Sequence, residues 1–173
     1  MTEDEMQDRD TRRQRTREAI TDALIGLMVS RRYAAIRTTD LIQAAGVGRS
    51  TFYEHFRSKD EVLVAVVEPI LAPLARAAAG RGNTARLRAM LDHLWERRAL
   101  ARHLFEPPLL VRLQRRLAAM IERLAESRVD EGIPASLAAR GAAARQLVML
   151  HTWLVGEVSC RSDALAKALV GVR

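Results

Sequence analysis

The chain has 173 residues, of which 49% are apolar and 28% charged, and its formal net charge is +7. This composition is typical of a globular protein, and because no apolar run approaches about 18 residues we expect no membrane-spanning helix and no membrane partner. The single cysteine, Cys160, excludes an internal disulfide and a cysteine-rich metal site. With an acidic start that resembles no secretory signal, the chain is expected in a reducing cytoplasm, without a metal or other cofactor.

The positive charge alone does not locate a nucleic-acid site. Residues 1–63 hold equal numbers of basic and acidic side chains, so residues 64–173 carry the whole excess. Arginine is far more frequent than lysine, a bias that the base composition of a genome explains as well as function does. The argument for a function therefore depends on the placement of particular side chains.

The start of the chain predicts a short tail followed by a helix. Residues 1–10 are polar and are expected to be disordered. A helix is predicted from about residue 11 to Ser30, because Ile20, Leu24 and Leu27 fall on one face. Its first turns carry four arginines, which suit either an arm that approaches DNA phosphates or the minor groove, or a solvated helix end. These arginines are Arg12, Arg13, Arg15 and Arg17.

Residues 37–59 predict two short helices around a tight turn. Thr38 is expected to cap the first helix, and Gly46 supplies the left-handed backbone that ends it. The second helix directs Phe52 and Phe56 inward at i, i+4, which leaves its polar side chains on another face. A helix that lies in a DNA groove needs polar side chains of this kind on its exposed face, whereas a helix that only faces solvent does not.

A family resemblance rests on these same residues. They are Thr38-Thr39, Ala45-Gly46-Val47, Ser50-Thr51-Phe52-Tyr53, His55-Phe56 and Ser58-Lys59. In this spacing they resemble the TetR/AcrR-type helix-turn-helix transcriptional regulators. The sequence departs from the family pattern at Gly48, where a serine or threonine usually caps the second helix, and at residues 31–33, where a glycine usually ends the first. The close resemblance covers about the first third of the chain.

The resemblance implies where DNA would be contacted. Arg49, Ser50 and Thr51 lie at the N-terminal end of the second helix, where side chains meet base edges. By resemblance, phosphates would be contacted by Tyr53, His55 and Lys59, and by Thr38 and Thr39 at the start of the first helix, with Gly48 as the cap of the second. For Tyr53 and His55 the alternative is packing or capping within the domain.

The rest of the chain predicts helices only. Ser58 and Glu61 form a capping box at the start of a helix in which Pro69 and Pro73 predict a sharp kink or break near residues 68–73, either a hinge or a static bend. Further helices are expected from Thr84, over residues 99–106, after Pro107, from Pro134 and from Ser162. No alternation typical of strands occurs.

The expected fold is therefore all-α, with three segments. They are a tail over 1–10, a three-helix helix-turn-helix domain over 11–58, and a C-terminal helical effector-binding and dimerisation domain over 59–173. Small residues in the first half of the helix after Pro134 favour close helix pairing, so residues 135–172 are the candidate homodimer interface. Packing within one chain is the alternative interpretation.

A pocket for a small hydrophobic effector is expected in the second domain. Its candidate residues are His93, Trp95, Phe105, Met120, Met149, His151 and Trp153. Each taken alone fits an ordinary core position equally well. The function predicted on these grounds is a repressor of palindromic operators that an unidentified small molecule releases from double-stranded DNA.

Two other classes of protein remain open. A sequence-independent basic DNA-binding protein has the same charge but no preferred site. A small helical enzyme is disfavoured, because the four histidines and Cys160 form no HExxH motif and no paired-cysteine motif, and the chain has no glycine-rich phosphate loop.

Overall fold

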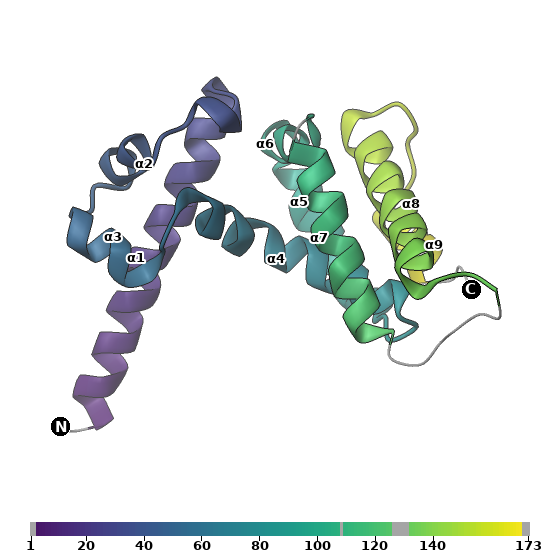
Figure 1. The fold of residues 1–173 in the computed structure, drawn as a ribbon, viewed down its shortest axis with the longest axis horizontal. Helices are drawn as coiled ribbons and strands as arrows, with labels where there is room; N and C mark the ends of the chain where they lie inside the picture. The colour runs from purple at the N-terminus through teal and green to yellow at the C-terminus, as the bar shows by residue number, and fades with distance from the viewer. Residues whose placement is uncertain (1–2, 108, 126–131, 171–173) are drawn as a thin grey trace. The chain divides into compact units, whose positions relative to one another are not determined.

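The computed structural model describes residues 3–107, 109–125 and 132–170, with side chains from residue 6 onward (Figure 1). Within those ranges every regular element is a helix and no strand occurs, which confirms the all-α prediction. No helix there is both long and apolar enough to cross a membrane. The chain divides into two compact units, Met1–Val67 and Glu68–Arg173.

The first unit contains three helices, a short turn of helix and the start of a fourth. They are α1 (Glu3–Ser30), η1 (Tyr33–Ala35), α2 (Thr38–Ala45), α3 (Arg49–His55) and the first half of α4 (Lys59–Ala78). The core of this unit comprises Ile20, Leu24, Ile36, Leu41, Phe52, Phe56 and Val62, all buried. Burial of these large side chains, each contributing on the order of 2 kcal/mol, holds three short elements that would be marginal alone.

The expected disordered tail is helical from Glu3 in this structure. The hydroxyl of Thr11 donates to the carbonyl of Gln7 at 2.8 Å, and Arg12 lies 3.7 Å from Asp8 one turn earlier. Such i, i+4 contacts favour helical backbone in a polar segment, which composition alone does not reveal. As a result α1 extends well beyond the apolar stripe that begins at Ile20.

Two helix caps differ from the prediction. Arg37, not Thr38, precedes α2, and its backbone N–H donates to the Asp40 carboxylate at 2.9 Å. Asn83, not Thr84, caps α5 (Thr84–Glu96) by accepting from the N–H of Arg86 at 2.9 Å. In each case a carboxylate or amide within one turn satisfies the free N–H groups at the helix start, so the hydroxyl is not needed.

The capping box predicted at the start of α4 is present in a shifted form. The Ser58 hydroxyl accepts from the N–H of Glu61 at 3.3 Å, as expected of the cap residue. The Glu61 carboxylate accepts at 2.6 Å from the N–H of Arg57, one residue before the cap. Both contacts fix the entry of the chain into α4 directly after α3.

The expected break near residues 68–73 does not occur. α4 is continuous from Lys59 to Ala78, with Pro69 and Pro73 inside it. Each proline removes one intrahelical N–H, and because they are four residues apart the donor missing from Pro73 is the one that would meet the Pro69 carbonyl. The first half of α4 is buried in the first unit and the second half in the second, and this burial sustains the helix across both sites.

The second unit is built from two pairs of packed helices. After α5 come α6 (Arg98–Ala101), η2 (Arg102–Phe105), α7 (Leu109–Leu124), α8 (Ala135–Val155) and α9 (Ser162–Val170). α7 packs along α8, as Figure 1 shows, and α9 packs along α5. The short helix expected at 99–106 and the helix starts expected after Pro107 and Pro134 are confirmed, whereas Pro108 and residues 126–131 lie outside the described part of the chain.

Candidate nucleic-acid interface

α2 and α3 are joined by a turn whose geometry follows from its glycines. Gly46 has φ +65°, the left-handed conformation that ends α2, and its N–H donates to the Gln43 carbonyl at 3.1 Å. Gly48 then takes an extended conformation and its carbonyl accepts from the N–H of Phe52 at 2.9 Å. This confirms Gly48 as the cap residue of α3, by its backbone and without a side-chain hydroxyl.

α3 has one buried and one exposed face. Phe52 and Phe56 are fully buried, with ring centroids 6.2 Å apart. Tyr53 meets the Phe52 ring edge-on at 5.4 Å, yet half of its side chain is exposed. The aromatic pair therefore anchors α3 from below and holds its other side toward solvent.

The predicted base-reading residues occupy that exposed side. Arg49 and Ser50 are exposed in the first turn of α3 and Thr51 is half-buried. Arg49 has five N–H donors in a planar fork, which matches the two acceptors on the major-groove edge of guanine. The exposed side chains of Arg49 and Ser50 are therefore available for base reading.

Among the predicted phosphate contacts, the side chains differ in how accessible they are. Thr39 is exposed in the first turn of α2, whereas Thr38 is half-buried beside it. His55 is half-buried at the C-terminal end of α3, so it and Arg49 lie at opposite ends of that helix. The structure thus brings these residues to the surface of one unit, at the start of α2 and along α3.

Lys59 has a structural role that the sequence did not reveal. Its ammonium donates to the carbonyl of Tyr33 at 3.0 Å and also to the carbonyl of Ile36, and it lies 4.6 Å from the centroid of the Tyr33 ring. The Tyr33 hydroxyl in turn donates to the Asp60 carboxylate. Two of the three ammonium donors of Lys59 therefore hold the η1 turn against α4, which leaves one for any phosphate.

The seven candidate effector residues fall into two contacting pairs and three separate positions. The Trp95 and Trp153 rings lie 4.7 Å apart, and the Trp153 indole donates to the Cys160 carbonyl at 2.9 Å. Phe105 lies 6.3 Å from the ring of His151. His93 is exposed, Met120 is buried and Met149 is half-buried. None of the seven lines the pocket between α7 and α8, the pocket between α5 and α9, or the pocket formed by α1 and His55.

A buried polar side chain that sequence reasoning missed, Gln146, lies on the face of α8 that also carries Met149 and Trp153. Gln146 is completely buried, and neither its amide oxygen nor its amide nitrogen has a hydrogen-bond partner among the described residues. It precedes Met149 and Trp153 by three and seven residues, so the three share a helix face. A glutamine within an otherwise apolar helix half offers no signal of its burial to sequence reasoning.

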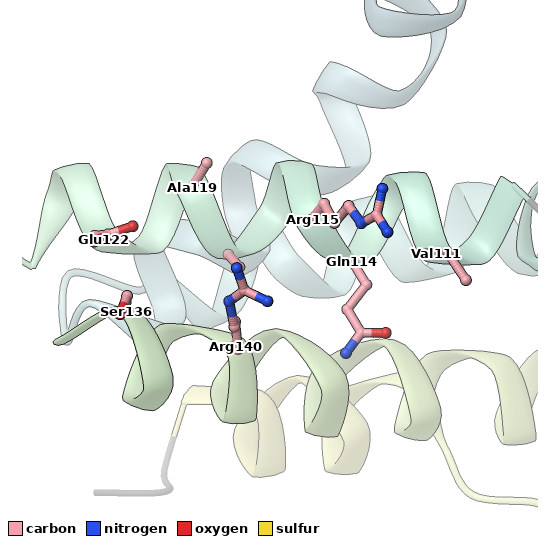
Figure 2. A pocket seen from close by; sticks show the side chains of 8 residues that line it. Val111, Gln114, Arg115, Ala119, Glu122, Ser136 and Arg140 are labelled. Atoms are coloured by element: carbon pink, nitrogen blue, oxygen red, sulfur yellow. The ribbon is translucent and has the colours of Figure 1, made fainter. Parts of the chain in front are cut away.

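The groove shown in Figure 2 runs between α7 and α8. Its volume is about 330 Å³, and Arg140 reaches from α8 toward α7 while Gln114 points from α7 toward α8. The remaining lining residues are Val111, Arg115, Ala118, Ala119, Glu122 and Ser136. Because most of these side chains are exposed, the groove is part of the outer surface of the second unit, not of its core.

Comparison with known proteins bears on the first unit above all. A family model described as "Bacterial regulatory proteins, tetR family" matches residues 20–66. The HTH-type transcriptional regulators YwcC of Bacillus subtilis and EthR of Mycolicibacterium smegmatis are each 37% identical over 57 residues, which is 33% of this chain. The matched segment spans only about a quarter of these relatives, 26% and 25% of their lengths.

Solved structures extend the likeness to the whole fold. A TetR transcriptional regulator from Streptococcus agalactiae has a TM-score of 0.57 at 24% identity, covering 96% of this chain and 97% of its own. The dihydroxyacetone kinase operon activator DhaS has a TM-score of 0.52 at 22% identity, covering 90% and 92%. The family and these relatives are transcriptional regulators by name, not enzymes.

Proposed function

We propose that this chain is a sequence-specific DNA-binding transcriptional regulator, because its residues 20–66 match the model of the TetR family of bacterial regulatory proteins. The observation that carries the proposal is the division of α3 into two faces. Phe52 is fully buried, while Arg49 and Ser50 in the same helix are exposed at its N-terminal end. A short helix anchored in this way presents side chains to the major groove without losing its own fold.

Each exposed group has a role that its chemistry suits. Arg49 donates two hydrogen bonds to a guanine, and Ser50 and Thr51 contact neighbouring base edges or methyl groups. Tyr53 and His55 contact phosphates, together with the two threonines in the first turn of α2. Lys59 has at most one free donor for a phosphate, so its main contribution is to hold the η1 turn in place for this surface.

Selection of binding sites from random DNA tests the proposal directly. A regulator recovers one sequence family and keeps a preference over random duplex of at least ~10³-fold. A sequence-independent basic protein, the rival interpretation, recovers no consensus, and its affinity falls steeply with salt for every duplex alike. The absence of any consensus in the selected pool is therefore the result that would overturn sequence-specific regulation.

We infer a homodimer, because one recognition helix reads only a few base pairs. In a dimer two α3 helices about 34–36 Å apart meet successive major grooves, which makes the operator a palindrome. Within residues 135–170, α8 carries exposed apolar side chains, of which Leu137 is 59% and Val148 62% exposed. α9 contributes less than the sequence implied, since its buried Leu165 and Leu169 lie in a helix packed on α5.

The exposed face of α8 has the pattern of a helix that pairs with its own copy. Leu137, Gly141, Ala144, Val148 and Val155 follow a spacing of four, three, four and seven residues, so they share one face. Antiparallel pairing with the two-fold axis between Ala144 and Arg145 sets the large Val148 opposite the small Gly141 of the second copy, and the reverse, as two-fold symmetry requires. The groove beside this face, between α7 and α8, belongs to the same surface and gives room for the partner's side chains.

We further propose that a small hydrophobic ligand releases the protein from its operator DNA. The face of α8 with Gln146, Met149 and Trp153 combines apolar contact area with one unsatisfied donor and one unsatisfied acceptor, as a ligand site requires. In one dimer conformation the two α3 helices have the spacing that fits DNA, and in another they do not. A ligand that binds the second conformation more tightly shifts the population toward it and so lowers DNA affinity. We propose repression as the outcome, and a reporter gene behind the selected operator distinguishes repression from activation.

The effector is tested by displacement from the selected duplex. Apolar compounds that carry both a donor and an acceptor are expected to weaken DNA binding and to change tryptophan fluorescence, because Trp153 lies on the same face. A DNA affinity that stays constant across a broad library of such compounds would count against release by an effector. It would leave sequence-specific binding itself unaffected.

A further inference from the structure

One face of α1 changes from apolar to basic where the helix extends beyond the core of its unit. Ile20, Leu24 and Met28 are spaced four residues apart and are buried. The same stripe, continued toward the N-terminus by steps of three or four residues, carries Arg17 and Arg13. The face that packs on the core at one end of α1 is therefore strongly basic at the other end.

This basic end of α1 lines a pocket with the end of α3. The pocket, which we call the α1–α3 pocket, has a volume of about 350 Å³. Its lining residues are Asp10, Arg13, Gln14, Arg17 and His55. The carbon of the Arg17 guanidinium lies 4.4 Å from the centroid of the Phe56 ring, so this side chain is held toward α3. Two guanidinium groups against one carboxylate leave the pocket positively charged.

We propose that the α1–α3 pocket holds a backbone phosphate of the DNA that α3 reads. Guanidinium forks match phosphate oxygens, and the His55 ring adds a further nitrogen at the pocket. His55 is six residues after Arg49, about 9 Å along α3, and the major groove is about 12 Å wide. A side chain this far from the base-reading end reaches the rim of the groove, where the backbone lies.

The pocket is distinct from a solvated helix end that happens to be rich in arginine. Arg12 is directed elsewhere and pairs with Asp8 at 3.7 Å. Arg15 is two residues from Arg13 and from Arg17, so it lies on the opposite side of α1 and does not line the pocket. Arg13 and Arg17, which continue the core-facing stripe, line the pocket together with His55 at the end of α3. The inference rests on the proposed function, because it requires DNA on α3.

The experiment compares Arg13→Gln with Arg15→Gln in the full-length protein. Both variants remove one positive charge from an exposed position of α1, so long-range attraction to DNA falls equally. With the duplex recovered from random DNA, the slope of log affinity against log salt is measured for each. Arg13→Gln is expected to lower the magnitude of the slope by about 0.9 per protomer relative to Arg15→Gln, and to leave sequence preference unchanged.

Ethylation interference locates the contact. In the wild-type complex, ethylation of one phosphate at the outer edge of each half-site should block binding, and this interference should disappear with Arg13→Gln alone. Equal slopes and equal interference patterns for the two variants overturn the phosphate site while sequence-specific binding stands. If the wild-type protein recovers no consensus duplex, the proposed function fails and the phosphate site fails with it, so the two failures are distinguishable.

Discussion

At the residue scale, Arg49 is the side chain on which base reading depends most. The residue that would normally cap α3 with a hydroxyl is Gly48, and Arg49 follows it at the exposed end of the helix. Arg49→Ala is expected to cost about 1–3 kcal/mol of binding free energy for the selected site and to relax preference at one base pair. Competition binding with single-base variants of the site measures both quantities. Unchanged affinity and preference would remove Arg49 from the reading surface.

Gln146 gives a prediction of opposite sign, a gain of stability. Its side chain is fully buried, and both amide atoms are without a partner in the described part of the chain. Since a buried donor or acceptor without a hydrogen bond costs about 1–3 kcal/mol, Gln146→Leu is expected to raise the free energy of unfolding by an amount in that range. Denaturant unfolding of the two proteins measures the difference.

The control for Gln146 is a glutamine on the surface. Gln43 is exposed on α2, so Gln43→Leu is expected to change stability by less than about 0.5 kcal/mol. A loss of stability in Gln146→Leu would mean that the amide is satisfied in solution, for instance by buried water. Glutamine would then be retained for the native fold and not for a ligand.

At the scale of elements, the helix-turn-helix depends on the backbone of Gly46. Its φ of +65° lies in the left-handed region, and a Cβ built there meets no atom within 4 Å. Gly46→Ala is therefore expected to destabilise the first unit by about 1–2 kcal/mol through backbone strain alone, without a steric clash. The measurement is thermal or denaturant unfolding followed by circular dichroism.

Gly26 provides the matched control for this backbone effect. It lies inside α1, and a Cβ built there also meets no atom within 4 Å. Gly26→Ala is expected to stabilise the protein by up to about 1 kcal/mol, because alanine loses less entropy in a helix interior. The same change of side chain should thus have opposite signs at the two positions. Equal effects would contradict the left-handed assignment at Gly46.

The elements also show where sequence reasoning succeeded and where it failed. The ends of α2 and α3 were predictable because Gly46, Phe52 and Phe56 act within one or two turns of chain. The predicted break in α4 does not occur, because a proline penalty of ~3 kcal/mol is local, whereas the burial of α4 residues such as Leu71 and Leu74 depends on the rest of the second unit. The caps at Arg37 and Asn83 were missed because several neighbouring polar residues compete for the same N–H groups.

At the scale of the whole molecule, binding to the proposed palindromic operator requires two copies of the chain. Val148→Glu introduces a charge into the exposed face of α8, which two-fold pairing would bury twice. The variant is expected to sediment as a monomer at micromolar concentration and to lose most of its affinity for the selected duplex. A wild-type protein that is itself monomeric under these conditions would refute the proposed dimer.

A second valine separates the interface from a general effect of charge. Val29 is 49% exposed on α1, which belongs to the other unit. Val29→Glu is expected to remain a dimer with unchanged sedimentation. If both variants dissociate, or if neither does, the face of α8 defined by Leu137, Gly141, Ala144, Val148 and Val155 is not the dimer contact.

The sequence by itself determined the all-α fold and the presence of the DNA-reading motif. Both follow from interactions within about twenty residues, such as the turn at Gly46 and the inward pair Phe52 and Phe56. Tertiary structure alone decided that Lys59 holds the η1 turn, that α9 packs on α5, and that Arg13 and Arg17 line one pocket with His55. These outcomes depend on which distant segments come together, and helical periodicity gives the face on which a side chain lies but not the partner it meets there.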